Sequence, residues 1–239
     1  MKTLYLSTAY LDDLMVRMAH HSTAIEGNSL TQGETKSVLI DGYVPRAIDL
    51  RELNEVLNYK AFTKEMVRFL QEKREVNGEF IKEIHSILCR EAIESVPGKF
   101  KTQPNMVIGA DFTPSPPYRV PMDIEQWRQD LDYQLKNAAD TRTMVEAICR
   151  QHFRFERIHP FPDGNGRVGR ALMVYSALQQ KLPPIVIPVD EKKKYINFLN
   201  TEDLNGFVEF CLVLQQKEVE RIKILADERD KVLEIYTEE

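Results

Sequence analysis

Apolar residues recur at helical spacing along most of this chain of 239 residues. In the stretch 50–72 they follow one helix face closely, at Leu53, Val56, Leu57, Phe62, Met66, Phe69 and Leu70. The same pattern predicts further helices at about 77–92, 123–137, 142–157, 166–182, 193–199, 204–214 and 215–235. Amphipathic helices bury their apolar faces against one another, so we expect an all-α helical bundle.

One long segment, residues 96–121, interrupts the helical pattern. It contains six prolines and two glycines, which exclude a continuous helix. Within it the run NMVIG and the following ADF predict a small β-hairpin. Long irregular connections in compact domains often carry function, so this segment is a candidate binding element.

Composition excludes several classes of protein. The net charge of −5 argues against a general nucleic-acid or anionic-membrane binder, because neutralising phosphates requires basic excess. Cys89, Cys149 and Cys211 lie far apart and indicate neither a disulfide framework nor a zinc site. Asp12 and Asp13 interrupt the N-terminal apolar run, and no run approaches transmembrane length. We therefore expect a cytoplasmic protein without nucleic-acid or membrane partners.

The segment 159–170, HPFPDGNGRVGR, is a glycine-rich loop that leads into a predicted helix. The unpaired N–H groups and the dipole at a helix N-terminus favour an anion. Gly164 and Gly166 allow the backbone to approach a phosphate closely. Arg167 and Arg170 are three positions apart and share one helix face. The loop is therefore a predicted phosphate site.

Two further residues of the segment suggest a reaction. Asp163 offers the carboxylate oxygen that Mg²⁺ prefers, and His159 is a base whose ordinary pKa is near neutral. Taken singly, each of these residues is more often an ordinary loop, cap or surface residue. Together, a base, a metal ligand and an anion site indicate group transfer from a nucleotide.

The segment 159–170 matches, without a departure, the H-x-F-x-[D/E]-G-N-G-R-x-x-R signature of the Fic (filamentation induced by cAMP) domain family. The stretch PGKFKTQPNMVIG…FTPSPP also resembles the segment that forms the flap of these proteins. The resemblance continues through HFRFERIHPF to DLNGFVEFCLVLQ and covers most of the chain beyond about residue 50. It implies a Fic fold with a β-hairpin flap, and transfer of AMP from ATP to a protein hydroxyl with release of pyrophosphate.

The resemblance also implies a role for each residue of the loop. His159 would take the proton from the target hydroxyl, and Asp163 would hold Mg²⁺ at the α- and β-phosphates. Phe161 would anchor the loop in the core. The remaining positions would bind ATP: Gly164, Asn165 and Gly166 as the anion hole, Arg167 at the outer phosphates and Arg170 at the γ-phosphate.

The flap, at about 103–114, would align an extended target peptide by strand addition. The residues expected to contact the target are Asn105, Met106, Val107 and Ile108. A surface hairpin that only stabilises the fold is the alternative. Tyr195 and Asn200 are candidate adenine contacts, although aromatic residues on helices are more often core residues.

A second short motif, STAIEGN at residues 22–28, lies near the N-terminus. Ser22 and Glu26 are four apart and share a helix face, and Gly27 marks a helix end. From these residues alone an ordinary short helix is expected. The motif resembles the [S/T]-x-x-x-E-[G/N] inhibitory motif of the family, which implies that Glu26 pairs with Arg170 and occupies the γ-phosphate site.

The expected organisation is an N-terminal helical region at 1–75, a Fic core at 76–215 and a C-terminal helix at 216–239. The predicted function is an autoinhibited protein adenylyltransferase that uses ATP and Mg²⁺ to modify a hydroxyl-bearing protein, itself included. Three alternatives stay open: removal of AMP with the help of Glu26, transfer of phosphate or another nucleotide, and a non-catalytic nucleotide-responsive binding module. A homo-oligomer that controls the inhibitory helix is also left open.

Overall fold

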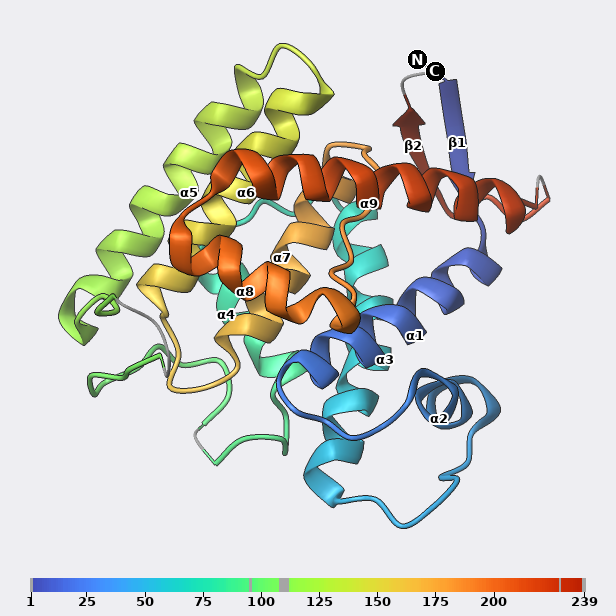
Figure 1. Cartoon of the computed structure of the whole chain (residues 1–239), viewed down its shortest axis with the longest axis horizontal. Helices are drawn as coiled ribbons and strands as arrows, with labels where there is room; N and C mark the ends of the chain where they lie inside the picture. Colours follow the sequence, from blue (N-terminus) through green and yellow to red (C-terminus); the bar gives the residue numbers. More distant parts are fainter. Residues whose placement is uncertain (1, 95, 108–111, 228, 238–239) are drawn as a thin grey trace.

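The computed structural model describes residues 2–94, 96–107, 112–227 and 229–237, and it is mainly helical (Figure 1). The helices in the described part are α1 (Thr8–Ile25), α2 (Gln32–Lys36), α3 (Leu50–Gln71), α4 (Gly78–Leu88), α5 (Val120–Lys136), α6 (Thr141–Ile158), α7 (Asn165–Gln179), α8 (Lys192–Thr201) and α9 (Leu204–Ile224). Short turns of other helix types lie at Ser37–Asp41, Pro117–Arg119 and Val189–Glu191. The expected all-α fold class is confirmed.

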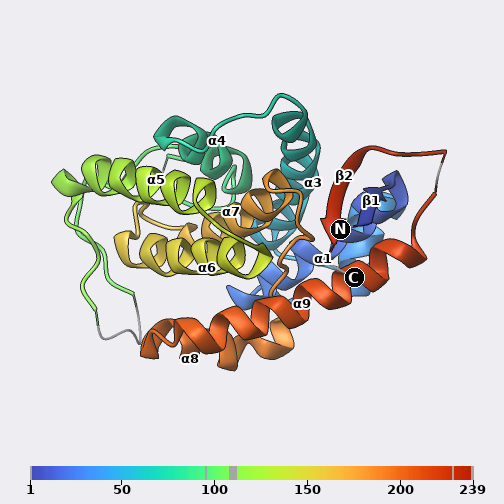
Figure 2. The same cartoon turned by 90° about the horizontal axis from the view of Figure 1, so that it is seen from above.

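Helix α7 is the centre of the bundle. It contacts α1, α3, α4 and α6, and Figures 1 and 2 both show it enclosed by them. A helix that is buried all round is apolar on most faces, and the run from Val168 to Leu178 is apolar except at Arg170 and Ser176. The helix that begins at the glycine-rich loop is therefore fixed by the core on all sides.

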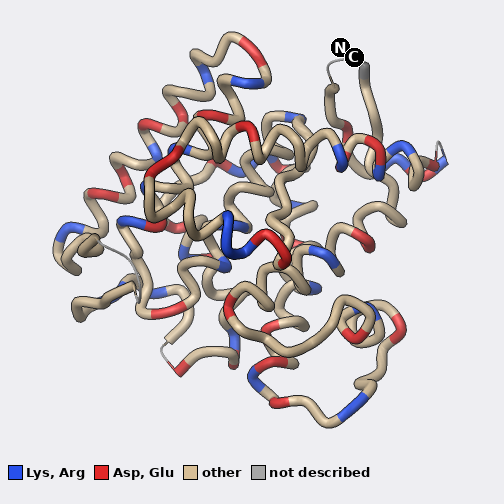
Figure 3. Tube along the Cα trace, in the orientation of Figure 1, with Lys and Arg blue, Asp and Glu red and all other residues tan. Residues whose placement is uncertain are grey.

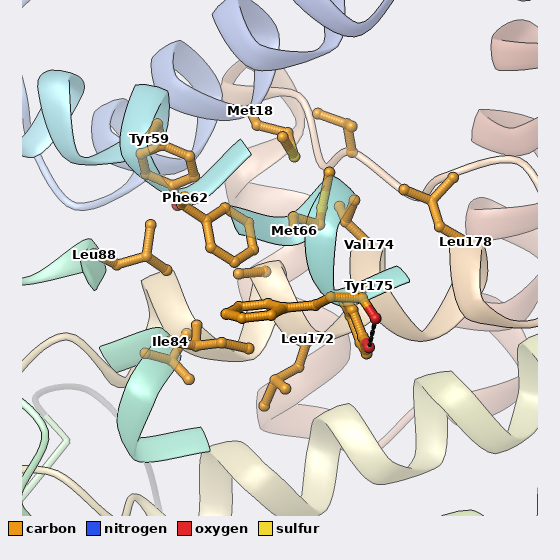
Figure 4. Packing of buried hydrophobic residues seen from close by; sticks show 14 of the residues in the cluster. Met18, Tyr59, Phe62, Met66, Ile84, Leu88, Leu172, Val174, Tyr175 and Leu178 are labelled. Atoms are coloured by element: carbon orange, nitrogen blue, oxygen red, sulfur yellow. Dashed lines mark hydrogen bonds between the residues drawn. The ribbon is translucent and has the colours of Figure 1, made fainter. Parts of the chain in front are cut away.

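Two apolar clusters pack around α7. The first joins α7 to α3 and α4, where Phe62 and Met66 meet Leu172 and Tyr175 (Figure 4). The second joins α6, α8 and α9 to Met173 and Ala177 on another face of α7. The site-bearing loop is thus connected to both halves of the core.

The one sheet of the described residues pairs the two ends of the chain, not the flap. Strand β1 (Lys2–Leu6) runs antiparallel to β2 (Leu233–Thr237) beside α9 (Figure 1). The prediction of a C-terminal helix at 216–239 is wrong beyond residue 224, because the chain returns there as a strand. The apolar residues of the short run LEIYT fit both a helical and a strand periodicity. The run forms a strand because it pairs with β1, and Ile235 is completely buried there. The predicted helices 204–214 and 215–235 are one helix, α9, that ends at Ile224.

The predicted flap hairpin is described only in part. Residues 108–111, Ile108 among them, lie outside the described residues, and the flanking described residues 96–107 and 112–116 contain no strand. Acidic and basic residues are both scattered over the whole trace (Figure 3). Within the described ranges no helix combines the length and apolarity needed to cross a bilayer.

Candidate active site

The glycine-rich loop is held in shape by its own side chains. Helix α6 ends at Ile158, and the next residue, His159, adopts left-handed backbone angles (φ 48°, ψ 60°). Helix α7 begins after Gly164, which is also left-handed at φ 78°. The Asn165 amide accepts from the Phe161 N–H and donates to the Phe161 carbonyl, both at 2.8 Å. Phe161 is fully buried and stacks on His85 at 3.8 Å, which confirms its expected anchoring role.

The imidazole of His159 is held in one orientation by its backbone neighbour. Its Nδ1 lies 3.2 Å from the carbonyl oxygen of Glu156, so Nδ1–H donates there and Nε2 keeps its lone pair. Burial lowers the pKa of His159 to about 4, and the positive charge of Lys101 acts in the same direction. The imidazole is therefore neutral over the ordinary range of pH.

Arg167 is buried but only loosely paired. Its side chain is 3% exposed, and its Nη1 and Nη2 lie 3.5 Å from Glu55 Oε1 and Asp163 Oδ1 respectively. Its Nε is buried without a hydrogen-bond partner among the described residues. A guanidinium with unused donors in a dry site is a strong anion ligand.

Arg170, in contrast, donates three hydrogen bonds to the N-terminal motif. Its Nε donates to Ser22 Oγ at 2.9 Å, and its Nη2 donates to the Ser22 carbonyl at 3.0 Å and to Glu26 Oε1 at 2.6 Å. Partial desolvation opposes ionisation of Glu26, but the Arg170 guanidinium outweighs it and holds the pKa of that carboxyl below its usual value. The structure thus brings the two motifs of the sequence into direct contact.

Two glycines make this geometry possible. A Cβ at Gly166 would lie 2.5 Å from Glu26 Oε1 and 2.9 Å from Arg170 Nη1. A Cβ at Gly164 would lie 2.4 Å from Cys89 Sγ, and the left-handed backbone there favours glycine independently. Gly164 also leaves the N-terminus of α7 without a side-chain cap, so its first N–H groups are available to an anion.

Asp163 suits a magnesium ion that is shared with a substrate. Its side chain is 61% exposed, and its Oδ1 accepts from the Gly164 N–H at 2.5 Å. Among the described residues no group of three or more His, Cys, Asp and Glu forms a metal site. One hard carboxylate beside a phosphate site fits Mg²⁺, which typically takes one or two carboxylates and completes its shell with phosphates and water.

The predicted adenine contact of Tyr195 is wrong. Tyr195 is 1% exposed, and its hydroxyl lies 2.8 Å from His152 Nε2 in the second cluster. A tyrosine at a buried helix position packs its ring in the core and pairs its hydroxyl there, which is what the alternative expected. Asn200 is exposed near the end of α8.

The side chains of the described flap residues differ in where they point and in how far they are exposed. Asn105 turns toward the catalytic loop, where its Nδ2 donates to the Phe161 carbonyl at 2.8 Å. Met106 is 87% exposed, and Val107 is half-buried. The side chain of Asn105 is therefore used within the protein, so that Met106 is the more accessible of these candidates for contact with a target.

Sequence reasoning missed several neighbours of the loop. His85 accepts from the Gly98 N–H at 2.7 Å and donates to the Asp163 carbonyl at 3.0 Å. Lys101 and Glu55 contribute charges on either side of the loop. A histidine on the apolar face of a predicted helix was a readable signal for His85. Lys101 and Glu55 carry no comparable signal, because their positions depend on tertiary contacts.

Comparison with known proteins agrees with this geometry. The model of the Fic/DOC family matches residues 75–177. The protein adenylyltransferase fic-1 of Caenorhabditis elegans is 29% identical over 211 residues, which are 84% of this chain and 40% of the relative. The protein adenylyltransferase Fic of Drosophila melanogaster is 28% identical over 221 residues, 91% of this chain and 41% of the relative. The chain thus spans about 40% of the length of these relatives.

Solved structures give the same result. A Fic domain containing signaling protein from Bacteroides thetaiotaomicron superimposes with a TM-score of 0.79 at 25% identity, covering 95% of this chain and 90% of that one. Fic-1 from C. elegans gives 0.73 at 27% identity, covering 92% of this chain and 66% of that one. The region that matches the Fic/DOC family model contains the whole loop from His159 to Arg170.

Proposed function

We propose that this protein is an adenylyltransferase that moves AMP from ATP to a hydroxyl side chain of a protein. One observation carries the proposal: a neutral imidazole with a free Nε2 and a buried arginine with unused donors lie at the two ends of one short loop. The names of the relatives support the same activity. A cytoplasmic location, where ATP and Mg²⁺ are abundant, is part of the proposal.

In the proposed reaction the target hydroxyl oxygen attacks the α-phosphorus and gives its proton to His159 Nε2. The bond from the α-phosphorus to its bridging oxygen breaks, and pyrophosphate leaves. The N-terminus of α7 and Arg167 bind the charge that develops on the phosphates. Mg²⁺ held by Asp163 would supply further charge neutralisation to the leaving pyrophosphate.

We also propose that the enzyme is autoinhibited. Glu26 occupies Arg170, which would otherwise bind the γ-phosphate. A carboxylate in this position repels the phosphate and competes for the same donors. ATP would then bind with its α-phosphate turned away from His159, where the hydroxyl cannot attack in line.

The test compares Glu26→Gly with the wild type, each incubated with Mg²⁺ and ATP labelled at the α- or γ-phosphate, with this protein itself as the first target. The expected result is label on protein from α-labelled ATP only, much more with Glu26→Gly than with wild type. His159→Ala in the Glu26→Gly protein should remove the label. Transfer from γ-labelled ATP would mean phosphate transfer instead, and nucleotide binding without label in any variant would mean a binding module.

Removal of AMP is a second candidate, favoured by the exposure of Glu26. The side chain is 40% exposed even though Oε1 is paired with Arg170, so its carboxylate is accessible to a water molecule. Label placed on protein by Glu26→Gly should then be lost on addition of wild type but not of Glu26→Gln. Equal loss with both proteins would exclude a role of Glu26 in removal.

A further inference from the structure

A buried ammonium group lies at the start of the flap, next to the catalytic loop. Lys101 is 4% exposed, and its Nζ donates to Asn105 Oδ1 at 2.6 Å and to the Ile158 carbonyl at 3.4 Å. Its backbone N–H donates to the Pro160 carbonyl at 2.9 Å. Among the described residues no carboxylate pairs with it, and burial lowers its pKa to about 8. Burying a charge with only neutral acceptors is costly, so this position is not one that packing alone favours.

The acceptors of Lys101 and Asn105 surround His159. Lys101 binds the carbonyl before it, at Ile158, while Asn105 Nδ2 donates to the Phe161 carbonyl at 2.8 Å and approaches the His159 carbonyl at 3.5 Å. The ammonium, the amide and three carbonyls of the loop thus form one connected set. Its effect is to fix the backbone on both sides of the catalytic histidine relative to residues 101–105 of the flap.

We propose that Lys101 is a positioning residue that fastens the flap to the catalytic loop, so that a target segment aligned on the flap meets His159 in a fixed geometry. The inference rests on the proposed transfer reaction and adds to it a residue that touches neither nucleotide nor target. Its charge contributes as well, because a cation beside the imidazole disfavours protonation of His159.

The first experiment uses Glu26→Gly as the parent and adds Lys101→Met or Lys101→Arg. The control is Lys60→Met, because Lys60 is an exposed lysine whose Nζ also donates to a backbone carbonyl, that of Leu39 at 2.7 Å. Misplacing a reacting group by about 1 Å can cost about a hundredfold in rate, so we expect Lys101→Met to lower the rate of AMP transfer by at least about tenfold. Lys60→Met should leave the rate unchanged. Equal rates for parent and Lys101→Met would overturn the proposal.

The pH profile separates this role from simple packing. In the parent, transfer should fall as pH rises past about 8, where Lys101 loses its proton. Lys101→Arg keeps a charge at all accessible pH, so the rate of that variant should not fall there. The same alkaline fall in Lys101→Arg would contradict the assignment, and this comparison holds even if Lys101→Met folds poorly.

Hydrogen exchange tests the fastening without any transfer. Lys101→Met should accelerate amide exchange both in residues 98–107 and in residues 159–166, and Lys60→Met in neither. If the Glu26→Gly parent transfers no label, the proposed function is wrong. The exchange result still shows whether Lys101 connects the flap to the catalytic loop. Acceleration in the flap alone, or no change, would show that Lys101 does not join the two segments.

Discussion

The Arg170 guanidinium donates to Glu26 Oε1 at 2.6 Å and joins the second turn of α7 to the end of α1 across 144 residues of chain. The same guanidinium contacts Ser22 one turn earlier on α1, and the missing Cβ of Gly166 leaves room for the carboxylate. Under the proposed function Arg170 binds the γ-phosphate, so Glu26 and the nucleotide would compete for one guanidinium. Substitutions in the N-terminal motif or in the loop at 159–170 should each change the balance between the two.

Ser22→Ala removes one of the contacts of Arg170 but leaves the Glu26 carboxylate and the Ser22 carbonyl. A net hydrogen bond is worth about 1 kcal/mol, so AMP transfer should rise by roughly two- to tenfold, less than in Glu26→Gly. Transfer from α-labelled ATP is the measurement, with Ser22→Thr as the control that keeps the hydroxyl. A rise as large as that of Glu26→Gly would show that Ser22, not Glu26, dominates the inhibition.

Gly164→Ala should damage both stability and nucleotide binding. The new Cβ meets Cys89 Sγ at 2.4 Å in a backbone with φ 78°, so we expect a loss of about 1–3 kcal/mol in the free energy of unfolding. Cys89→Ala in the same chain relieves only the clash. Urea unfolding of Gly164→Ala with and without Cys89→Ala separates the clash from the backbone strain. Gly33→Ala is the control, because no atom lies within 4 Å of its Cβ position. Equal stability of Gly164→Ala and Gly33→Ala would refute the strain at this position.

Asp163→Asn should abolish Mg²⁺-dependent transfer in the Glu26→Gly protein without unfolding it. The side chain is 61% exposed, and its only contact with a buried side chain among the described residues is a loose one of 3.5 Å to Arg167, so the free energy of unfolding should change by less than about 1 kcal/mol. Chelation of Mg²⁺ should reduce transfer in the parent to the level of the variant. Transfer that survives chelation would remove the metal from the account.

The buried carboxyl of Glu156 should make the free energy of unfolding depend on pH. Burial raises the pKa of its carboxyl to about 7, above the ordinary value of 4.5, so its contribution to stability is full below pH 4.5 and is lost as pH rises through 7. The difference in unfolding free energy between wild type and Glu156→Gln should therefore fall by about 1 kcal/mol from pH 6 to pH 8. Urea titrations at the two pH values measure it, and a constant difference would contradict a buried, protonated Glu156.

The local sequence was sufficient to predict the glycine-rich loop, but it was not sufficient to predict the residues that surround this loop. The turn that leads into α7 could be predicted because Gly164, Gly166 and the start of the helix are neighbours in sequence. The pairing of Glu26 with Arg170 came only from the family resemblance, since no periodicity relates residues that far apart. Lys101 lay outside any prediction because what makes it unusual, burial among loop carbonyls, exists only in the folded chain.

The prediction for the C-terminal segment was wrong for a different reason. Five residues such as 233–237 carry too little periodicity to distinguish a strand from the end of a helix, and pairing with β1 decided. Tyr195 was a candidate adenine contact from its place after the Pro183-Pro184 break, but its hydroxyl pairs with His152 in the core. Tertiary contacts selected the outcome in both cases.

The central claim is that the loop at 159–167 holds a triphosphate with its innermost phosphorus at the catalytic imidazole. A crystal structure of Glu26→Gly with Mg²⁺ and an ATP analogue that cannot be cleaved between the α- and β-phosphates tests this directly. The account predicts the α-phosphorus facing His159 Nε2 with space for one hydroxyl oxygen, and the outer phosphates on Arg167 and Arg170. A γ-phosphorus at His159, or an empty loop with the analogue bound elsewhere, would contradict it.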